Sequence, residues 1–213
     1  MTKRARGEGV GRLEAFSDAV LAIVLTLLVL DLLPRTAQSP NELLEDWPAY
    51  LSFLAAFLKI GIMWLNHSQA MSRLRRANPT VLVLNLGLLL GASLVPWPTA
   101  LISNALKEGD RPAQIAAIFV FALVTILISV PWAAMDIYLA RHPQYLSSPQ
   151  DVQWMRAHAR TSIATIAAAG ISVGIAFFSP LAALVLYVVI GATFIVLRLR
   201  ERDSGDGHAG PAD

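Results

Sequence analysis

Six long apolar segments make up most of this chain and restrict it to a membrane-embedded helical fold. They cover residues 13–33, 49–70, 80–105, 112–139, 160–178 and 181–198. A helix of about 20 predominantly apolar residues is long enough to cross the hydrocarbon core of a bilayer. Only short connections remain between the segments. The sequence therefore predicts an all-α integral membrane protein, with six transmembrane helices in one domain over residues 1–202.

The composition agrees with this class and argues against enzymatic chemistry. Hydrophobic residues make up 55% of the chain and charged residues 15%, against about 25% charged residues in soluble domains. The absence of cysteine excludes disulfides, thiolate metal sites and cysteine nucleophiles. The histidines show no metal-ligand spacing such as HExxH. We therefore predict that the protein is not an enzyme and that it holds no metal. The Gly- and Asp-rich residues 203–213 are predicted to form a disordered tail.

The distribution of positive charge predicts the orientation of the spans. Most Lys and Arg residues fall on the side of the N-terminus, and only Arg35, Lys107 and Arg111 fall in the opposite loops. Cytoplasmic loops carry the excess of Lys and Arg. An even number of spans then puts both termini in the cytoplasm. We expect a multi-pass protein of a bacterial-type plasma membrane.

The first apolar segment combines an apolar stripe with polar groups near its start. At about 100° per residue, Ile23, Leu27 and Leu30 fall on one side of a helix and Thr26 borders them. Asp18 lies roughly opposite Ile23. Polar groups in a membrane segment are costly and often functional. Taken alone, the periodicity favours side chains that simply face lipid or a neighbouring helix.

The same segment carries a motif that resembles a known family. The motif is Arg12-x-x-x-Phe16-Ser17-Asp18, followed by Ala22-Ile23, Thr26-Leu27 and Leu30-Asp31, and later by Trp64, His67, Asn85 and the Pro96–Pro98 pair. This pattern closely resembles the transmembrane protein 175 family of potassium channels. The resemblance covers about the first hundred residues. The last three apolar segments match only in number and hydrophobicity.

The resemblance implies a homotetramer in which the first helix of each subunit lines a central pore. Ile23, Leu27 and Leu30 would then form rings of apolar side chains that act as a hydrophobic gate, and Thr26 would place a hydroxyl near the same constriction. No loop of the TVGYG type, which forms the filter of other potassium channels, occurs in the sequence. The expected partners are membrane lipid, further copies of the chain and monovalent cations, with potassium as the permeant ion. No other cofactor and no nucleic acid is expected.

The resemblance also suggests a polar network that ties the first helix to its neighbours. Ser17 and Asp18 would belong to it, with Trp64, His67 and Asn85 as partners. Trp64 and His67 are three residues apart and so share one helical face. A buried carboxylate needs hydrogen-bond donors, and indole, imidazole and carboxamide groups supply them. Polar contacts of this kind also occur as general links between membrane helices.

Two roles stay open for each of the other motif residues. Asp31 would form a ring that attracts cations at the pore mouth, or it is a solvated residue at a helix end. Arg12 neutralises Asp18, or it anchors the inner end of the helix. Phe16 contributes to packing or to gating.

A secondary transporter is the alternative function. Transporters often contain broken helices near mid-membrane and internal repeats. The first segment has no Gly or Pro before Pro34, and no repeat between the two halves is evident. The surroundings of two further residues are not determined by the motif. Lys59 falls within the second segment and needs a partner or access to the interface. His158 is expected to lie solvated in an inner loop.

Overall fold

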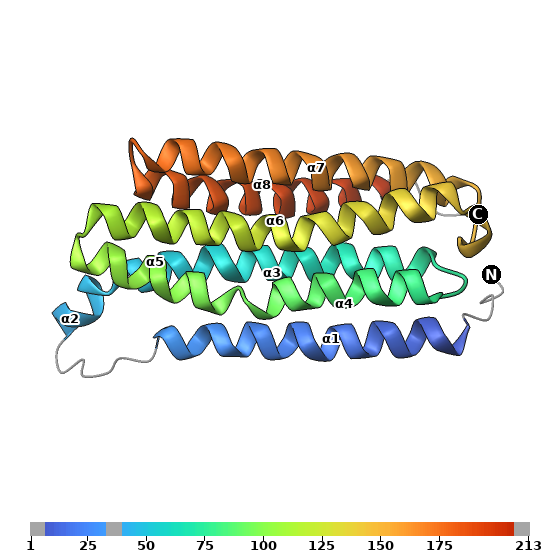
Figure 1. The fold of residues 1–213 in the computed structure, drawn as a ribbon, viewed down its shortest axis with the longest axis horizontal. Coiled ribbons are helices and arrows are strands. Elements are labelled where there is room, and N and C mark those ends of the chain that lie inside the picture. The colour runs from blue at the N-terminus through green and yellow to red at the C-terminus, as the bar shows by residue number, and fades with distance from the viewer. Residues whose placement is uncertain (1–6, 33–39, 207–213) are drawn as a thin grey trace.

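The architecture is an elongated bundle of long helices, seen in a computed structural model that describes residues 7–32 and 40–206 (Figure 1). Predominantly apolar sequence satisfies its backbone polar groups within helices, as a bilayer requires. The helices in chain order are α1 (Glu8–Leu28), η1 (Val29–Leu32), α2 (Pro40–Glu45), α3 (Trp47–Arg73), α4 (Pro79–Ser93), α5 (Pro96–Glu108), α6 (Arg111–Arg141), η2 (Pro143–Tyr145), α7 (Gln150–Ala176) and α8 (Pro180–Asp206).

Within the described residues, four helical segments are long and apolar enough to cross a membrane. They are α3, the α4–α5 pair taken together as Pro79–Glu108, α6 and α7; the apolar part of α8, Pro180–Val196, is shorter. Helix α1 has 21 residues, and its first half contains Glu8, Arg12, Glu14 and Asp18. Because of these charges, composition alone does not identify α1 as a membrane-spanning helix, although Ala19–Leu28 contains no charged residue.

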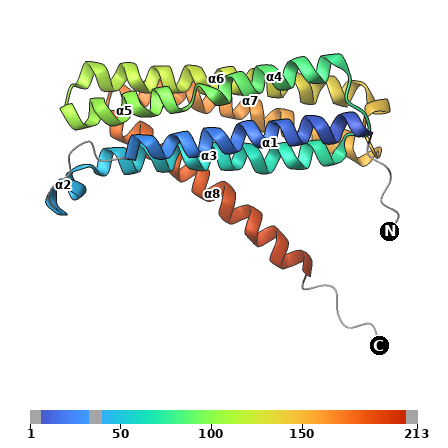
Figure 2. The same ribbon diagram turned by 90° about the horizontal axis from the view of Figure 1, so that it is seen from below.

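Helix α6 lies in the middle of the bundle, and α1 lies at its edge. Helix α6 packs against α4, α5, α7 and α8, while α1 packs on α3 and α4. Successive long segments run in opposite directions along the bundle (Figure 1). Seen from below, α1 lies alongside α3, and α8 diverges from the other helices along its length (Figure 2). This arrangement leaves one side of α1 without cover from its own chain.

Backbone hydrogen bonds join three segments of the chain at one end of the bundle. Gly7 N–H donates to the carbonyl of Arg75 at 3.4 Å, and Arg75 N–H donates to the carbonyl of Tyr145 at 2.8 Å. Leu74 and Leu146 form an isolated antiparallel bridge. The start of α1, the α3–α4 connection and the α6–α7 connection therefore meet at this end.

The helix boundaries follow from local sequence. The third apolar segment is divided into α4 and α5 before Pro96, because Pro96 and Pro98 lack the N–H groups that would continue the helix. Helix α4 begins after Asn78, whose side chain accepts a hydrogen bond from Val81 N–H at 2.9 Å, as an N-cap does.

Helix α7 begins ten residues before the apolar segment that starts at residue 160. Asp151 accepts hydrogen bonds from the N–H of Ser148 at 2.8 Å and from its hydroxyl at 2.9 Å, which stabilises the first turn. At the other end of the chain, α8 continues to Asp206. It thereby extends into the segment 203–213 that the sequence assigns to a disordered tail. Arg and Glu favour helix, and residues 207–213 lie outside the described part.

Small residues allow α4 to approach α6 closely. A Cβ atom added at Gly91 would lie 2.7 Å from Ile128 Cγ1 and 3.1 Å from the Ile128 backbone nitrogen. A Cβ atom added at Gly87 would lie 3.3 Å from Cγ of Pro131. Small residues at helix contacts permit such packing in membrane proteins.

Candidate functional site

Helix α1 has one face packed in the bundle and one face exposed. Leu21, Val24 and Leu28 are buried in a cluster with residues of α3, α4 and α6. On the other face, the exposed fractions are 58% for Ile23 and 42% for Leu27, and Leu30 in the following turn η1 is 58% exposed. The three residues of the predicted apolar stripe are thus among those that the subunit itself leaves uncovered.

The polar and aromatic residues around this stripe differ in their surroundings. Thr26 is exposed, and its hydroxyl donates to the carbonyl of Ile23 at 2.7 Å. Its oxygen lone pairs therefore remain available as acceptors. Phe16 and Arg12 are exposed as well. The side chain of Asp31, the predicted pore-mouth carboxylate, lies outside the described residues.

A directed chain of hydrogen bonds links α1, α4 and α3. The Asn85 side chain donates from Nδ2 to Ser17 Oγ at 2.9 Å, and Ser17 Oγ donates to the carbonyl of Leu13 at 2.9 Å. The carbonyl oxygen of Asn85 lies 2.9 Å from His67 Nε2. Because that oxygen can only accept, Nε2 carries the proton. All three side chains are buried.

Asp18 and Trp64 form a second contact between α1 and α3. The indole Nε1–H of Trp64 donates to Asp18 Oδ1 at 3.1 Å. Trp64 is 43% exposed, so this contact lies at the rim of the bundle. The five residues of the predicted network therefore form two groups. One is the buried Ser17–Asn85–His67 chain, and the other is the Asp18–Trp64 pair.

A further cluster of polar side chains joins α6 to α7. Asp136 on α6 is fully buried, and its Oδ2 lies 2.7 Å from His158 Nδ1 on α7. Trp132 Nε1 lies 3.0 Å from the same nitrogen. A single Nδ1 cannot donate to the carboxylate and accept from the indole at the same time. We assign its proton to the shorter contact with Asp136.

The expectation that His158 is solvated is wrong. The residue is only 8% exposed, because α7 begins at Gln150 and carries His158 into the bundle. Trp154 stacks on its ring at 4.8 Å. Sequence reasoning did not pair His158 with Asp136. The available signal was one ionisable residue, Asp136, near the end of the apolar segment 112–139 and a second, His158, just before the next segment, 160–178.

Trp132 lies between the two buried polar groups. Its ring meets the ring of His67 edge-on, with centroids 6.2 Å apart at 90°, and it also contacts His158. His67 Nδ1 is buried and has no hydrogen-bond partner within the described part of the chain. The chain from Ser17 to His67 is therefore continued by aromatic packing toward α6 and α7.

Comparison with known proteins shows which family these elements resemble. The family model described as "Endosomal/lysosomal potassium channel TMEM175" matches residues 12–96. This range contains α3, α4 and the part of α1 that follows its first turn. It includes Ser17, Asp18, Trp64, His67 and Asn85.

Individual relatives give the same result. A protein of Streptomyces collinus named as a potassium channel is 41% identical over 135 residues, which cover 62% of this chain and 65% of the relative. A potassium channel of Chamaesiphon minutus is 36% identical over 129 residues, covering 57% of this chain and 64% of that protein. The matched parts thus span just under two thirds of each relative.

A solved structure extends the likeness to nearly the whole fold. The crystal structure of a lysosomal potassium-selective channel TMEM175 homologue from Chamaesiphon minutus aligns with a TM-score of 0.71 at 27% sequence identity. The alignment covers 89% of this chain and 98% of that one. Helices beyond the family match therefore share the architecture as well.

Proposed function

The chain belongs to the TMEM175 family, and on that premise we propose that it forms a potassium-permeable cation channel. The family is one of channels and not of enzymes. In the proposed assembly, six helical segments of each subunit cross the membrane. Four copies of α1 surround a central pore. The names of the relatives support potassium as the permeant ion.

The observation that carries this proposal is the uncovered stripe on α1. Ile23 and Leu27 are exposed on α1, whose opposite face is packed in the bundle, and Leu30 is exposed in the turn η1 that follows it. Helix α1 lies at the edge of the bundle (Figure 2), where a fourfold axis could bring four copies together. Other helices also expose apolar side chains, as lipid-facing helices do. The family membership is what favours α1 as the pore helix.

A pore lined by these side chains closes by dewetting. Water is unstable in a narrow apolar neck, so rings of Ile23, Leu27 and Leu30 exclude ions without blocking the pore completely. A small rotation or dilation of α1 rewets it. Selectivity then depends on partial dehydration, because potassium gives up water more readily than sodium. The acceptor oxygen of Thr26 would contact the partly dehydrated ion near the constriction.

The polar contacts of α1 hold it in place and do not contact the ion in this mechanism. The Ser17–Asn85–His67 chain fixes the buried side of α1, and Asp18 is held by Trp64. Both contacts lie in the half of the helix that precedes the stripe. Asp18→Asn should therefore impair assembly or gating.

We also propose that both termini face the cytoplasm of a bacterial-type plasma membrane. The end of the bundle that joins Gly7, Arg75 and Tyr145 also carries Arg76 and Arg141. Positive charge of this kind marks the cytoplasmic side. At the opposite end, a ring of Asp31 carboxylates would concentrate cations at the pore mouth.

Recording from the purified protein in a planar bilayer tests the function. Unitary potassium currents that carry many ions per opening are expected. A secondary transporter completes a conformational cycle for each substrate and gives no unitary steps. Absence of unitary steps, together with saturable potassium uptake into vesicles, would overturn the channel assignment.

A further inference from the structure

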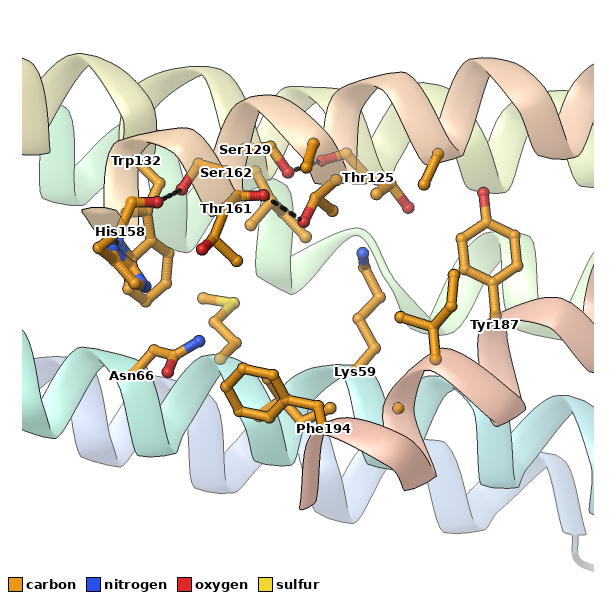
Figure 3. Close-up of a pocket in the computed structure, with 18 of the residues that line it drawn as sticks. Lys59, Asn66, Thr125, Ser129, Trp132, His158, Thr161, Ser162, Tyr187 and Phe194 are labelled. Atoms are coloured by element: carbon orange, nitrogen blue, oxygen red, sulfur yellow. Dashed lines mark hydrogen bonds between the residues drawn. The ribbon is translucent and has the colours of Figure 1, made fainter. Parts of the chain in front are cut away.

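A cavity of about 360 Å³ lies between helices of the subunit (Figure 3), and no described residue of α1 lines it. Its lining residues come from α3, α6, α7 and α8. The volume falls within the range of small-molecule sites, which is about 300–1,000 Å³. Neither the pore nor the polar contacts of α1 account for this space.

Lys59 projects from α3 into the cavity (Figure 3). It lies near the middle of α3, far from either end of the helix. Its Nζ lies 5.8 Å from the centre of the Phe121 ring. Within the described residues, no Asp or Glu side chain forms an ion pair with it, and no Asp or Glu lines the cavity. A charged ammonium group in such a place is costly unless it is paired with a counter-charge.

The hydroxyl groups of the cavity wall do not act as further donors. Thr125, Ser129, Ser162 and Thr165 each donate to the carbonyl four residues earlier on their own helix. Their protons are thereby used, and only oxygen lone pairs face the cavity. Lys59 is therefore the lysine that offers donors to an anionic group in the cavity, and the carboxamide of Asn66 is a further lining group with N–H donors.

The rest of the wall is largely apolar. It includes apolar side chains from all four helices, such as Met63 of α3, Ile128 of α6, Ala168 of α7, and Ile190 and Phe194 of α8. A small inorganic anion would lose its hydration shell here and find one ammonium group in return. A molecule that joins an anionic group to an apolar chain would instead satisfy both parts of the wall.

We propose that this cavity binds an amphiphile that has one carboxylate head group and an apolar chain. The carboxylate pairs with Lys59, and the chain contacts the apolar side chains. Such a ligand reaches the site from the lipid. Three lining residues, Thr161, Ala164 and Ile190, are also exposed, so the cavity reaches the subunit surface along α7 and α8.

Quenching of tryptophan fluorescence by brominated dodecanoate tests this proposal, because Trp132 lines the cavity. The protein is held in nanodiscs of zwitterionic lipid, and the methyl ester of the same acid serves as the uncharged probe. Saturable quenching by the acid is expected, with about tenfold weaker binding of the ester, because the ester cannot form a charge-assisted hydrogen bond with Lys59. Trp132→Phe should remove most of the quenching.

Variants separate the role of the charge from that of the space. Lys59→Met should lower the affinity for the acid to that of the ester, and Lys59→Arg should preserve the preference. Ala168→Phe fills the cavity and should abolish binding of both probes. Ala167→Phe is the matched control, because Ala167 is exposed and does not line the cavity. Size-exclusion profiles identify any variant that does not fold.

Three results would overturn the proposal. Equal binding of acid and ester to the unmodified protein would remove any role for Lys59. Unchanged binding of the acid to Lys59→Arg, Lys59→Met and Ala168→Phe alike would locate the probe elsewhere. Displacement of the acid by chloride, with no dependence on the length of the probe chain, would identify a small inorganic anion as the occupant. None of these measurements depends on channel activity.

Discussion

Asn85 Nδ2 donates a hydrogen bond to Ser17 Oγ at 2.9 Å, across the contact between α4 and α1. The other end of the same amide accepts from His67 on α3. One carboxamide therefore satisfies two buried polar side chains from two different helices. Because the Ser17 hydroxyl donates its own hydrogen bond to the Leu13 carbonyl, the direction of every hydrogen bond in the chain is determined.

Replacement of Asn85 by leucine should destabilise the subunit. The substitution keeps the approximate volume but leaves Ser17 Oγ and His67 Nε2–H without their partner. The expected loss is about 1–3 kcal/mol of unfolding free energy. Thermal unfolding of the detergent-solubilised protein, followed by circular dichroism, measures it. Asn104→Leu is the control, because Asn104 is exposed on α5. Equal melting temperatures for both variants would contradict this role of Asn85.

The Asp18–Trp64 contact should contribute less than the buried chain. It is a single hydrogen bond at 3.1 Å, and its indole is partly exposed. A double-mutant cycle with Asp18→Leu and Trp64→Phe should give a coupling of about 0.5–1.5 kcal/mol. The same unfolding assay on the two single variants and the double variant provides the values. Strictly additive effects would show that the two side chains do not stabilise each other.

The close contact between α4 and α6 predicts that Gly91 cannot accept a larger residue. The added Cβ of Gly91→Ala would lie 2.7 Å from Ile128 Cγ1 and near its backbone, so α4 must move away from α6. Overpacking of this kind costs about 1–3 kcal/mol. Gly174→Ala is the matched control on α7, where no atom lies within 4 Å of the added Cβ. That change should be neutral or slightly stabilising, since alanine favours helix over glycine. A comparison of their melting temperatures tests the prediction, and a stable Gly91→Ala protein would contradict it.

The sequence predicts the membrane-spanning class well because hydrophobicity is a local property. It also predicts that Trp64 and His67 share a face of one helix, because that depends only on their spacing. Which partner each residue takes depends on how helices cross. In the structure, Asp18 forms a hydrogen bond with Trp64, and Asn85 forms one with His67. No spacing rule distinguishes this pairing from the reverse.

The least predictable contacts are those between residues on different helices beyond the motif. The sequence places His158 in a loop because the apolar segment starts only at residue 160, whereas hydrogen bonds from Ser148 to Asp151 start the helix earlier. Once His158 is helical and faces α6, the buried carboxylate of Asp136 comes within 2.7 Å of its ring. Hydropathy contains no information about such a pairing.

The exposed stripe of α1 leads to the prediction that most directly tests the pore. If Ile23 and Leu27 form the narrow apolar neck, Ile23→Ala or Leu27→Ala widens it and lowers the free energy needed to wet it. Each reduction of that barrier by about 1.4 kcal/mol raises the ion flux through the closed state about tenfold. Single-channel recording should therefore show larger currents or increased leak. Ile171→Ala on α7 is the control, because Ile171 is equally exposed, at 60%, but lies on a helix assigned to no pore. If both α1 variants and this control conduct alike, the stripe faces lipid and the pore lies elsewhere.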